Sequence, residues 1–557
     1  MRRALLLCGV ALTACGGDDA PPTGAIEYQT LHYDFAFDLD SHAAASAVTL
    51  SITAGGDCLD IPMRAPGLAE LTLDGAPPTS AGVDGGVLHV CGAGWFEGDE
   101  LQLRVTDAVA QQTWSTETES SQVGYSESLD REGKRFRYLV SWIGGCDQFG
   151  PCDNRPDRFA TYTFTVSHPE GVVVLCPGTI TAGATETVCD FPYPGGPTYS
   201  TFGIAATESW TPTDLGTWGD VHVTFYDTPS TGVVDAIDTD YLAGFLGFME
   251  DHFGPYPYGS ELRFATGPTH WGGFEHPGNI LLTDGLATAA GGYADPVNHT
   301  ATHELTHMWA GDQTTLADTY DFAWKESMAE YLSFVYEDES QPAAVAQLTA
   351  HRWKQYAGSS AYYPVPEEHP VLLDYYLDTY NPGPMILFRQ LEVMFSRDAV
   401  LAALADLLGA QRAISVDDVQ AALEEHTGAD LSGYLDAWLR GSGEPVWPSV
   451  TVDVADAGGG DVDVTVTPTA GSEPFGCAFT VELTGDGGES LEVAFDRGVD
   501  GGAEPITVTA TPGFAVTGHV LDPRAQCLIS EASSAAAGPR RSMRALPAAV
   551  RYPGLIP

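Results

Sequence analysis

Alternation of hydrophobic and polar residues dominates the first part of the chain. Residues 33–39, 48–52 and 162–166 alternate with a period of two, the pattern of strands that bury one face. Clusters of Gly, Pro and Asp separate such runs. We therefore predict a β-sandwich-like N-terminal domain over residues 27–213.

The spacing of apolar residues becomes helical after residue 213. A strand near residues 221–226 precedes a helix over 233–252. Further helices are predicted over residues 295–310, 322–337, 342–357, 381–396, 398–409, 415–426 and 430–440. This region, residues 214–446, is expected to form a mixed α+β domain.

A β pattern returns near the end of the chain. Residues 450–454 and 462–466 alternate strictly, with glycine-rich turns nearby. We predict a small β-sandwich over residues 447–530. Residues 531–557 are rich in Ala, Pro and Arg, and we expect a flexible tail there.

The first residues have the features of an export signal. Arg2 and Arg3 precede a short apolar run within residues 1–15. Its last four residues resemble a bacterial lipobox, which implies cleavage before Cys15, lipidation of that cysteine, and a tether over residues 16–26. We therefore expect export across the bacterial inner membrane and a lipid anchor in the cell envelope or on the surface. The alternative is an ordinary signal peptide in which Cys15 has no role.

Eight of the ten cysteines remain once Cys8 and Cys15 are set aside. An even number suits disulfides in an oxidising compartment. Eight cysteines allow 105 connectivities, and proximity alone favours local pairs. These pairs are Cys58–Cys91, Cys146–Cys152, Cys176–Cys189 and Cys477–Cys527. A second metal site is the alternative, but the cysteines lack the close spacing that it requires.

The chain is strongly acidic. Its 557 residues include 24 basic and 76 acidic ones, a formal charge of −52. This charge excludes nucleic acid as a partner, because such binding depends on Lys and Arg at phosphates. The negative charge of the protein either attracts cations and amine-bearing substrates or only keeps the surface well solvated.

One short motif carries the clearest chemistry. Residues 303–307 read His-Glu-Leu-Thr-His, which places His303 and His307 on one helical face, where both can ligate one zinc ion. Glu304 is then the candidate general base toward water. Glu326 is the candidate third ligand, and two His plus one Glu is a set found in catalytic zinc sites. We predict one Zn²⁺ per chain.

Glu326 lies on the predicted helix over 322–337, which must return antiparallel to the motif helix to deliver a ligand. Glu330 follows one turn later. It either orients a metal ligand from behind or belongs to a solvated helix face.

The motif and its third ligand together resemble the gluzincin aminopeptidases, the aminopeptidase N and leukotriene-hydrolase group. That group carries a G-x-M-E-N strand upstream of the motif, and residues 272–277 read Gly-Gly-Phe-Glu-His-Pro. The resemblance implies that Glu275 binds the free α-amine of a peptide. It also implies that backbone groups of Gly272 and Gly273 hold the peptide as an added strand.

Residues 380–385, Tyr-Asn-Pro-Gly-Pro-Met, are similar to the family's Y-x-K-G-x-M. The resemblance implies that Tyr380 donates a hydrogen bond to the oxyanion of the reaction. From the residues alone, Tyr363, Tyr375 and Tyr376 are equal competitors.

The resemblance spans roughly residues 30–447 and implies a thermolysin-like zincin catalytic domain. The family's large helical C-terminal domain is replaced here by the small β-sandwich. Three positions depart from the family pattern around the pocket: Trp142, His276 and Lys325. The last two stand where the family has asparagine.

Together these features predict a multidomain α+β protein that acts as a zinc aminopeptidase in the cell envelope. Its partners would be peptides with a free N-terminus and, through the lipid anchor, a membrane; no oligomeric state is predicted. Two alternatives stay open. One is a zinc endopeptidase with the same ligands, and the other is a non-catalytic envelope lipoprotein that binds a partner.

Overall fold

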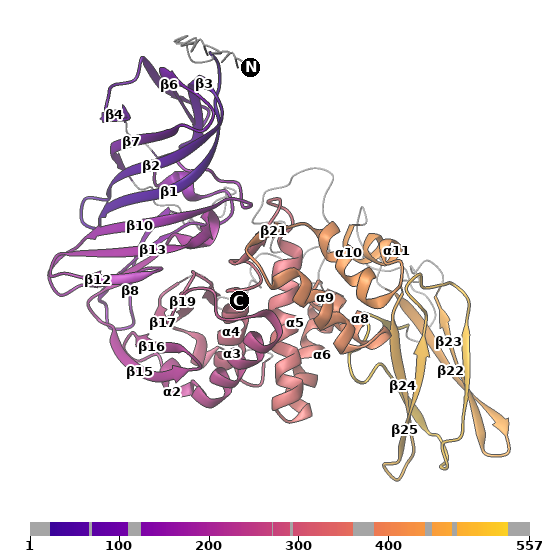
Figure 1. The fold of residues 1–557 in the computed structure, drawn as a ribbon. Coiled ribbons are helices and arrows are strands. Elements are labelled where there is room, and N and C mark those ends of the chain that lie inside the picture. Colours follow the sequence, from indigo (N-terminus) through magenta and orange to yellow (C-terminus); the bar gives the residue numbers. More distant parts are fainter. Residues whose placement is uncertain are drawn as a thin grey trace, which may run out of the picture.

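A computed structural model describes residues 23–65, 70–109, 124–269, 271–289, 293–359, 384–440, 448–469 and 476–532. Figure 1 shows the strands of the N-terminal part at one end, the helices in the middle and a second group of strands at the other end. The chain is therefore a multidomain α+β protein with a β-rich N-terminal domain, as predicted.

The N-terminal part is built on a seven-stranded sheet. Its strand order is β12 (Thr179–Ala182), β13 (Glu186–Pro197), β10 (Phe159–Ser167), β1 (Glu27–Asp38), β2 (Ala43–Ala54), β7 (Glu100–Val109) and β4 (Glu70–Leu73). β1 pairs in parallel with β10 and antiparallel with β2. The predicted alternation is confirmed, because Tyr33, Phe35 and Phe37 on β1 are buried while their neighbours are less so.

Two smaller sheets complete this part. One has the order β11 (Val173–Leu175), β14 (Gly203–Thr207), β9 (Arg135–Val140) and β8 (Gly124–Leu129), and the other β3 (Gly56–Pro62), β6 (Val87–Trp95) and β5 (Ser80–Asp84). Short helices η1 (Cys146–Gln148) and α1 (Thr198–Thr201) lie in the connections.

Phe202, between α1 and β14, holds an aromatic cluster together. Its fully buried ring contacts Phe35, Phe149, Tyr162 and Phe164 at centroid distances of 4.8–5.7 Å. Aromatic rings in such offset and edge-to-face contacts contribute packing beyond the area that they bury. The cluster therefore joins the large sheet to the segment that leads into β14.

The central part begins with a five-stranded sheet. Its order is β15 (Thr211–Trp218), β16 (Val221–Asp227), β17 (Glu261–Gly267), β19 (Asn279–Thr283) and β18 (Gly273–Phe274). β16, β17 and β19 run parallel, whereas β18 pairs antiparallel with β19. Within the described residues β18 ends this sheet, so its outer backbone edge faces the site described below.

Helices lie between the strands of this sheet and after them. They are α2 (Val233–Ala236), α3 (Thr239–Phe253), η2 (Leu286–Thr288), α4 (Pro296–Thr306), α5 (Phe322–Ser340), α6 (Ala343–Ser359), α8 (Pro384–Met394), α9 (Arg397–Leu408), α10 (Val416–Thr427), α11 (Ser432–Leu435) and the π-helical turn η3 (Asp436–Arg440). β20 (Thr314–Leu316) and β21 (Arg412–Ile414) form a short parallel pair. No helix of the described residues is long and apolar enough to cross a membrane.

Two predicted helices differ from the structure. The predicted helix over 233–252 is broken, because Ile237 is extended and Asp238 caps a new helix by accepting a hydrogen bond from the backbone of Tyr241. The helix predicted over 295–310 ends at Thr306, where the chain turns toward β20.

The C-terminal part has its own core. One sheet has the order β26 (Ile506–Ala510), β23 (Asp461–Pro468), β22 (Ser449–Gly458) and β28 (Ser530–Glu531), and the other β25 (Ser490–Asp496), β24 (Ala478–Thr484) and β27 (Gly518–Leu521). Their facing apolar residues form one cluster, separate from the main core. Lys354 of α6 binds Asp522, and Gln390 of α8 accepts a hydrogen bond from the backbone of Leu528, which ties this sandwich to the helices.

The eight described cysteines form four disulfides. They join Cys58 to Cys91, Cys146 to Cys152, Cys176 to Cys189 and Cys477 to Cys527, the pairs expected from proximity. Each links segments of one β-rich part, so none crosses from the strands to the helices.

Phe202→Ala tests the aromatic cluster. We expect the free energy of unfolding to fall by about 3–5 kcal/mol, because the alanine leaves a cavity among four rings. Urea denaturation followed by tryptophan fluorescence measures it. Phe96→Ala is the control, since Phe96 is 43% exposed and its loss should change stability by about 0.5 kcal/mol or less. Equal effects of the two substitutions would contradict the role given to Phe202.

Candidate metal centre and active site

The helix α4 brings the two histidines together. Asp295 caps it through the backbone of Asn298, and Pro296 occupies its first turn, where a missing N–H costs nothing. His303 lies in the last turn, and His307 follows the helix end with backbone angles that are still helical. Their Nε2 atoms are 3.1 Å apart as a result.

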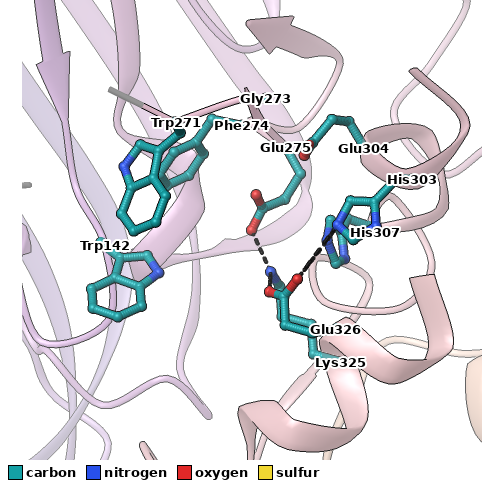
Figure 2. Close-up of a pocket in the computed structure, with 10 residues that line it drawn as sticks. All are labelled: Trp142, Trp271, Gly273, Phe274, Glu275, His303, Glu304, His307, Lys325 and Glu326. Carbon is teal, nitrogen blue, oxygen red and sulfur yellow. Dashed lines mark hydrogen bonds and ion pairs between the residues drawn. The ribbon is translucent and has the colours of Figure 1, made fainter. Parts of the chain in front are cut away.

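Glu326 comes from α5 and meets both histidines (Figure 2). Its Oε2 atom is 3.4 Å from Nε2 of His303 and 3.6 Å from Nε2 of His307. Ligands at about 2.0–2.1 Å from a tetrahedral zinc ion lie about 3.3–3.4 Å from one another. Glu304 also lies in the group, its ligand atom within 4.8 Å of those of the histidines. The closer Glu326 is the better third ligand, and the donor set fits zinc as predicted.

Each histidine is oriented from behind by an acceptor. Nδ1 of His307 donates a hydrogen bond to the carbonyl of Ala310 at 2.9 Å. Nδ1 of His303 is 3.4 Å from Oε1 of Glu330. These contacts leave the Nε2 lone pair of each ring directed at the metal position.

Glu330 is fully buried, so the helix-face alternative for it is wrong. It accepts hydrogen bonds from the hydroxyl of Tyr293 at 2.9 Å and from His299, which also pairs with Glu337. Burial alone would lower the pKa of His299, but Glu337 and Glu330 outweigh it and raise that pKa to about 9. A buried network of charged groups therefore supports His303, a predicted metal ligand.

Glu275 follows β18 and faces the predicted metal ligands. Its Oε1 atom is 2.8 Å from Nζ of Lys325, and the same Nζ is 2.7 Å from Oε1 of Glu326. All three side chains are at least nine-tenths buried. Burial alone would lower the pKa of Lys325, but the two carboxylates raise it above its usual range.

Glu304 points from α4 toward β18. Burial, with the nearby carboxylates of Glu275 and Glu326, raises the pKa of Glu304 to about 8 against the opposing effect of His303. Gly273 makes room for this side chain, because a Cβ there would lie 2.3 Å from Oε1 of Glu304. The predicted base thus lies beside the edge strand predicted to hold the substrate.

Aromatic side chains close the other side of the site. Trp142, Trp271 and Phe274 line a small cavity together with the charged residues. The rings of Trp142 and Trp271 are 5.9 Å apart. The sequence drew attention to Trp142 as a departure, but Trp271 was missed, because a lone tryptophan before a strand has no distinctive spacing.

His276, the second departure, has a structural role. Its Nδ1 donates to the carbonyl of Ser200 at 2.7 Å, and its Nε2 accepts from the hydroxyl of Tyr138. The ring is fully buried and stacks on Phe274. Gly203 makes room for it, since a Cβ there would collide with the ring. His276 therefore braces the end of β18 against the N-terminal part.

Two predicted residues lie outside the described part of the chain. These are Tyr380, with its competitors Tyr363, Tyr375 and Tyr376, and the lipidation candidate Cys15. The structure brings together the other predicted site residues, which are Glu275, Gly273, His303, Glu304, His307 and Glu326. Gly272 directly precedes β18, and its carbonyl accepts a hydrogen bond from the backbone of Thr283.

Comparison with known proteins agrees with this geometry. Residues 238–438 match the family model described as the peptidase family M1 domain. The chain carries a peptidase family M1 domain. The predicted likeness to the gluzincin aminopeptidases is confirmed.

Two curated relatives are similar over part of their length. Aminopeptidase N of Streptomyces lividans is 26% identical over 337 residues, which are 52% of this chain and 36% of the relative. Aminopeptidase 2 of Candida albicans is 24% identical over 269 residues, 44% of this chain and 28% of the relative. The chain thus spans about a third of the length of these relatives.

Solved structures share the fold of the M1 domain and of the parts of the chain next to it. The M1 zinc metallopeptidase from Deinococcus radiodurans has a TM-score of 0.62 at 18% identity and covers 75% of this chain and 94% of its own. The aminopeptidase A of Legionella pneumophila, solved with aspartic acid, has a TM-score of 0.69 at 14% identity. The match covers 91% of this chain and 60% of the Legionella chain. At these identities the likeness concerns the fold alone.

Glu330→Gln tests the support of the metal ligand. We expect the zinc affinity to fall by about 10–100-fold, because His303 loses its charged acceptor. Competition with a chromogenic chelator measures the dissociation constant. Glu339→Gln is the control on the same helix, since Glu339 is half exposed and pairs with Arg397. An unchanged affinity in Glu330→Gln would refute the orienting role.

Proposed function

We propose that this protein is a zinc-dependent aminopeptidase, which hydrolyses the N-terminal peptide bond of peptides. One observation carries the proposal: the donor atoms of His303, His307 and Glu326 converge beside an edge strand that is directly followed by Glu275. The M1 domain and the two aminopeptidases among the relatives support it.

The substrate would bind as an added strand along β18. The inner edge of β18 pairs with β19, and Thr283 holds the carbonyl of Gly272. An extended peptide can use the outer backbone groups of Gly273, while Gly272 anchors the strand through its carbonyl. This mode brings the peptide backbone over Glu304, which lies directly across from Gly273.

The protein's own groups would then move the protons. When bound by His303, His307 and Glu326, zinc supplies a Lewis acid that polarises the scissile carbonyl and lowers the pKa of water. Glu304 accepts a proton from the attacking water and passes it to the leaving amine. Tyr380 is proposed to donate a hydrogen bond to the oxyanion.

Glu275 would set the register of cleavage. It lies one residue beyond β18, at the end of the added strand. A fixed, buried carboxylate there favours a cationic α-amine and places the first peptide bond over the metal.

A zinc endopeptidase is the second candidate, and the ion pair of Lys325 with Glu275 favours it. A carboxylate that is already paired recognises an α-amine less strongly. The ligands and Glu304 would serve both functions in the same way.

We also propose that the protein acts in the cell envelope. The signal-like residues 1–15, the lipobox at Cys15 and the even set of paired cysteines support export and lipid anchoring. Incorporation of labelled palmitate in wild type and in Cys15→Ala would test the anchor.

Glu304→Gln tests the catalytic assignment. We expect kcat for an aminoacyl 4-nitroanilide to fall by about 10²–10⁴-fold, because the general base is lost while the metal ligands remain. Zinc content, measured by atomic absorption, should stay at the wild-type value. A chelator should abolish the wild-type activity, and added zinc should restore it. Retained turnover in Glu304→Gln would sink the assignment.

Glu275→Gln tests amine recognition. We expect KM for a substrate with a free α-amine to rise by about tenfold, because a charge-assisted hydrogen bond is lost, while the N-acetylated counterpart is little affected. Steady-state kinetics on both substrates measure the change. Glu261→Gln is the control, an exposed glutamate on β17 of the same sheet. Equal cleavage of free and acetylated substrates by the wild type would refute the exopeptidase proposal.

A further inference from the structure

Lys325 places its ammonium group inside the candidate substrate cavity. Its Nζ lies 2.8 Å from Glu275 and 2.7 Å from Glu326, so one cation bridges the amine-binding candidate and a metal ligand. Figure 2 shows the side chain rising from α5 to the carboxylate of Glu275. An α-ammonium of a substrate would need this same carboxylate.

The aliphatic part of the Lys325 side chain is held in place by close packing. Gly311 has a left-handed φ of 144°, and a Cβ there would lie 2.8 Å from Cε of Lys325. The ring of Tyr199 lies on another side, 5.8 Å from Nζ. Tyr199 is itself fixed, because its hydroxyl donates to the carbonyl of Gly311 at 2.6 Å. The surroundings thus direct the ammonium at Glu275 rather than toward solvent.

The charge balance in the cavity also indicates that Lys325 opposes binding of an α-ammonium. The titratable residues that line the cavity are Glu275, Glu304, Glu326, Lys325 and two histidines. The histidines are neutral when they bind a metal, so three acidic groups and one basic group remain. With Glu304 deprotonated, as a general base must be, these groups sum to two negative charges, which a divalent zinc ion neutralises. Without the lysine one negative charge would remain for an α-ammonium. With it, a substrate ammonium enters a neutral site and meets a like charge.

We propose that Lys325 is a specificity-determining residue that competes with the α-amine of the substrate for Glu275. This inference rests on the proposed peptidase function and refines its substrate class. Peptides with a free N-terminus bind weakly, because they must displace or share the partner of Lys325. Peptides with an uncharged, acylated N-terminus lose little by comparison, so the protein discriminates only modestly against them.

The test compares two substrates within each preparation of the full-length zinc protein. L-phenylalanine 4-nitroanilide carries a free amine, and its N-acetyl derivative does not. We define the selectivity as the ratio of their kcat/KM values. Partial loss of zinc lowers both kcat/KM values by the same factor, so its effect cancels in the ratio.

Removing the charge should raise the selectivity. We expect Lys325→Asn and Lys325→Met to increase the ratio by about tenfold or more, because Glu275 becomes free for the substrate. Lys325→Arg keeps the charge and should keep the ratio near the wild-type value. Lys134→Asn is the control for loss of a lysine, since Lys134 pairs with Glu208 on the surface.

A double-mutant cycle assigns the effect to Glu275. In the Glu275→Gln background, Lys325→Met should leave the ratio unchanged, because no carboxylate remains for the two ammonium groups to share. A purely structural lysine would instead lower kcat/KM for both substrates alike in either background.

Binding provides a readout that needs no turnover. In the Glu304→Gln protein, calorimetry should give an affinity for L-phenylalaninamide that is higher than that for its N-acetyl derivative by about tenfold or less. Adding Lys325→Met should strengthen binding of the free amine by about tenfold and leave the acetylated compound unchanged.

Unchanged ratios in both neutral variants would overturn the inference while leaving the proposed function intact. Failure of both neutral variants to fold would also overturn it, since the lysine would then serve the architecture. The absence of chelator-sensitive hydrolysis of either substrate by the wild type would refute the proposed function itself.

Discussion

The site depends on one constraint: its ionised side chains are buried away from water and must be paired. Glu275, Glu326 and Glu330 are buried, and a buried carboxylate is stable only when it is paired. Lys325 and the histidines provide those pairs, and their attraction keeps the pKa values of the carboxylates below the usual range despite burial. The resulting network holds α4, α5 and the end of β18 in one arrangement.

The surrounding fold brings that arrangement to a substrate. β18 lies at the edge of its sheet within the described residues, so one backbone edge is paired and the other faces Glu304. His276 connects the end of this strand to Ser200 and Tyr138 of the N-terminal part. The N-terminal strands therefore contribute to the position of Glu275, although none of the predicted metal ligands lies on them.

Much of the site could be predicted because its chemistry depends on short spacings. His303 and His307 lie four residues apart on a helix, which puts them on one face whatever surrounds them. The residues that support these histidines lie further away in the sequence, and their roles were harder to predict. Glu330 remained ambiguous, because burial of a helix face depends on which helices pack there. The break at Ile237 was missed, since a local cap at Asp238 overrode continuous apolar spacing.

The sequence by itself determined which chemistry to expect: the predicted metal donors, the predicted base and the strand alternation all follow from local periodicity, which the backbone imposes on any chain. Only the tertiary structure decided the electrostatics of the cavity. Lys325 and Glu275 are far apart along the chain, and their ion pair exists because α5 and β18 pack around one centre. No local rule encodes such a contact, since it depends on the relative placement of two separate elements. The departure at Lys325 was visible in the sequence, but the carboxylate that it binds was not.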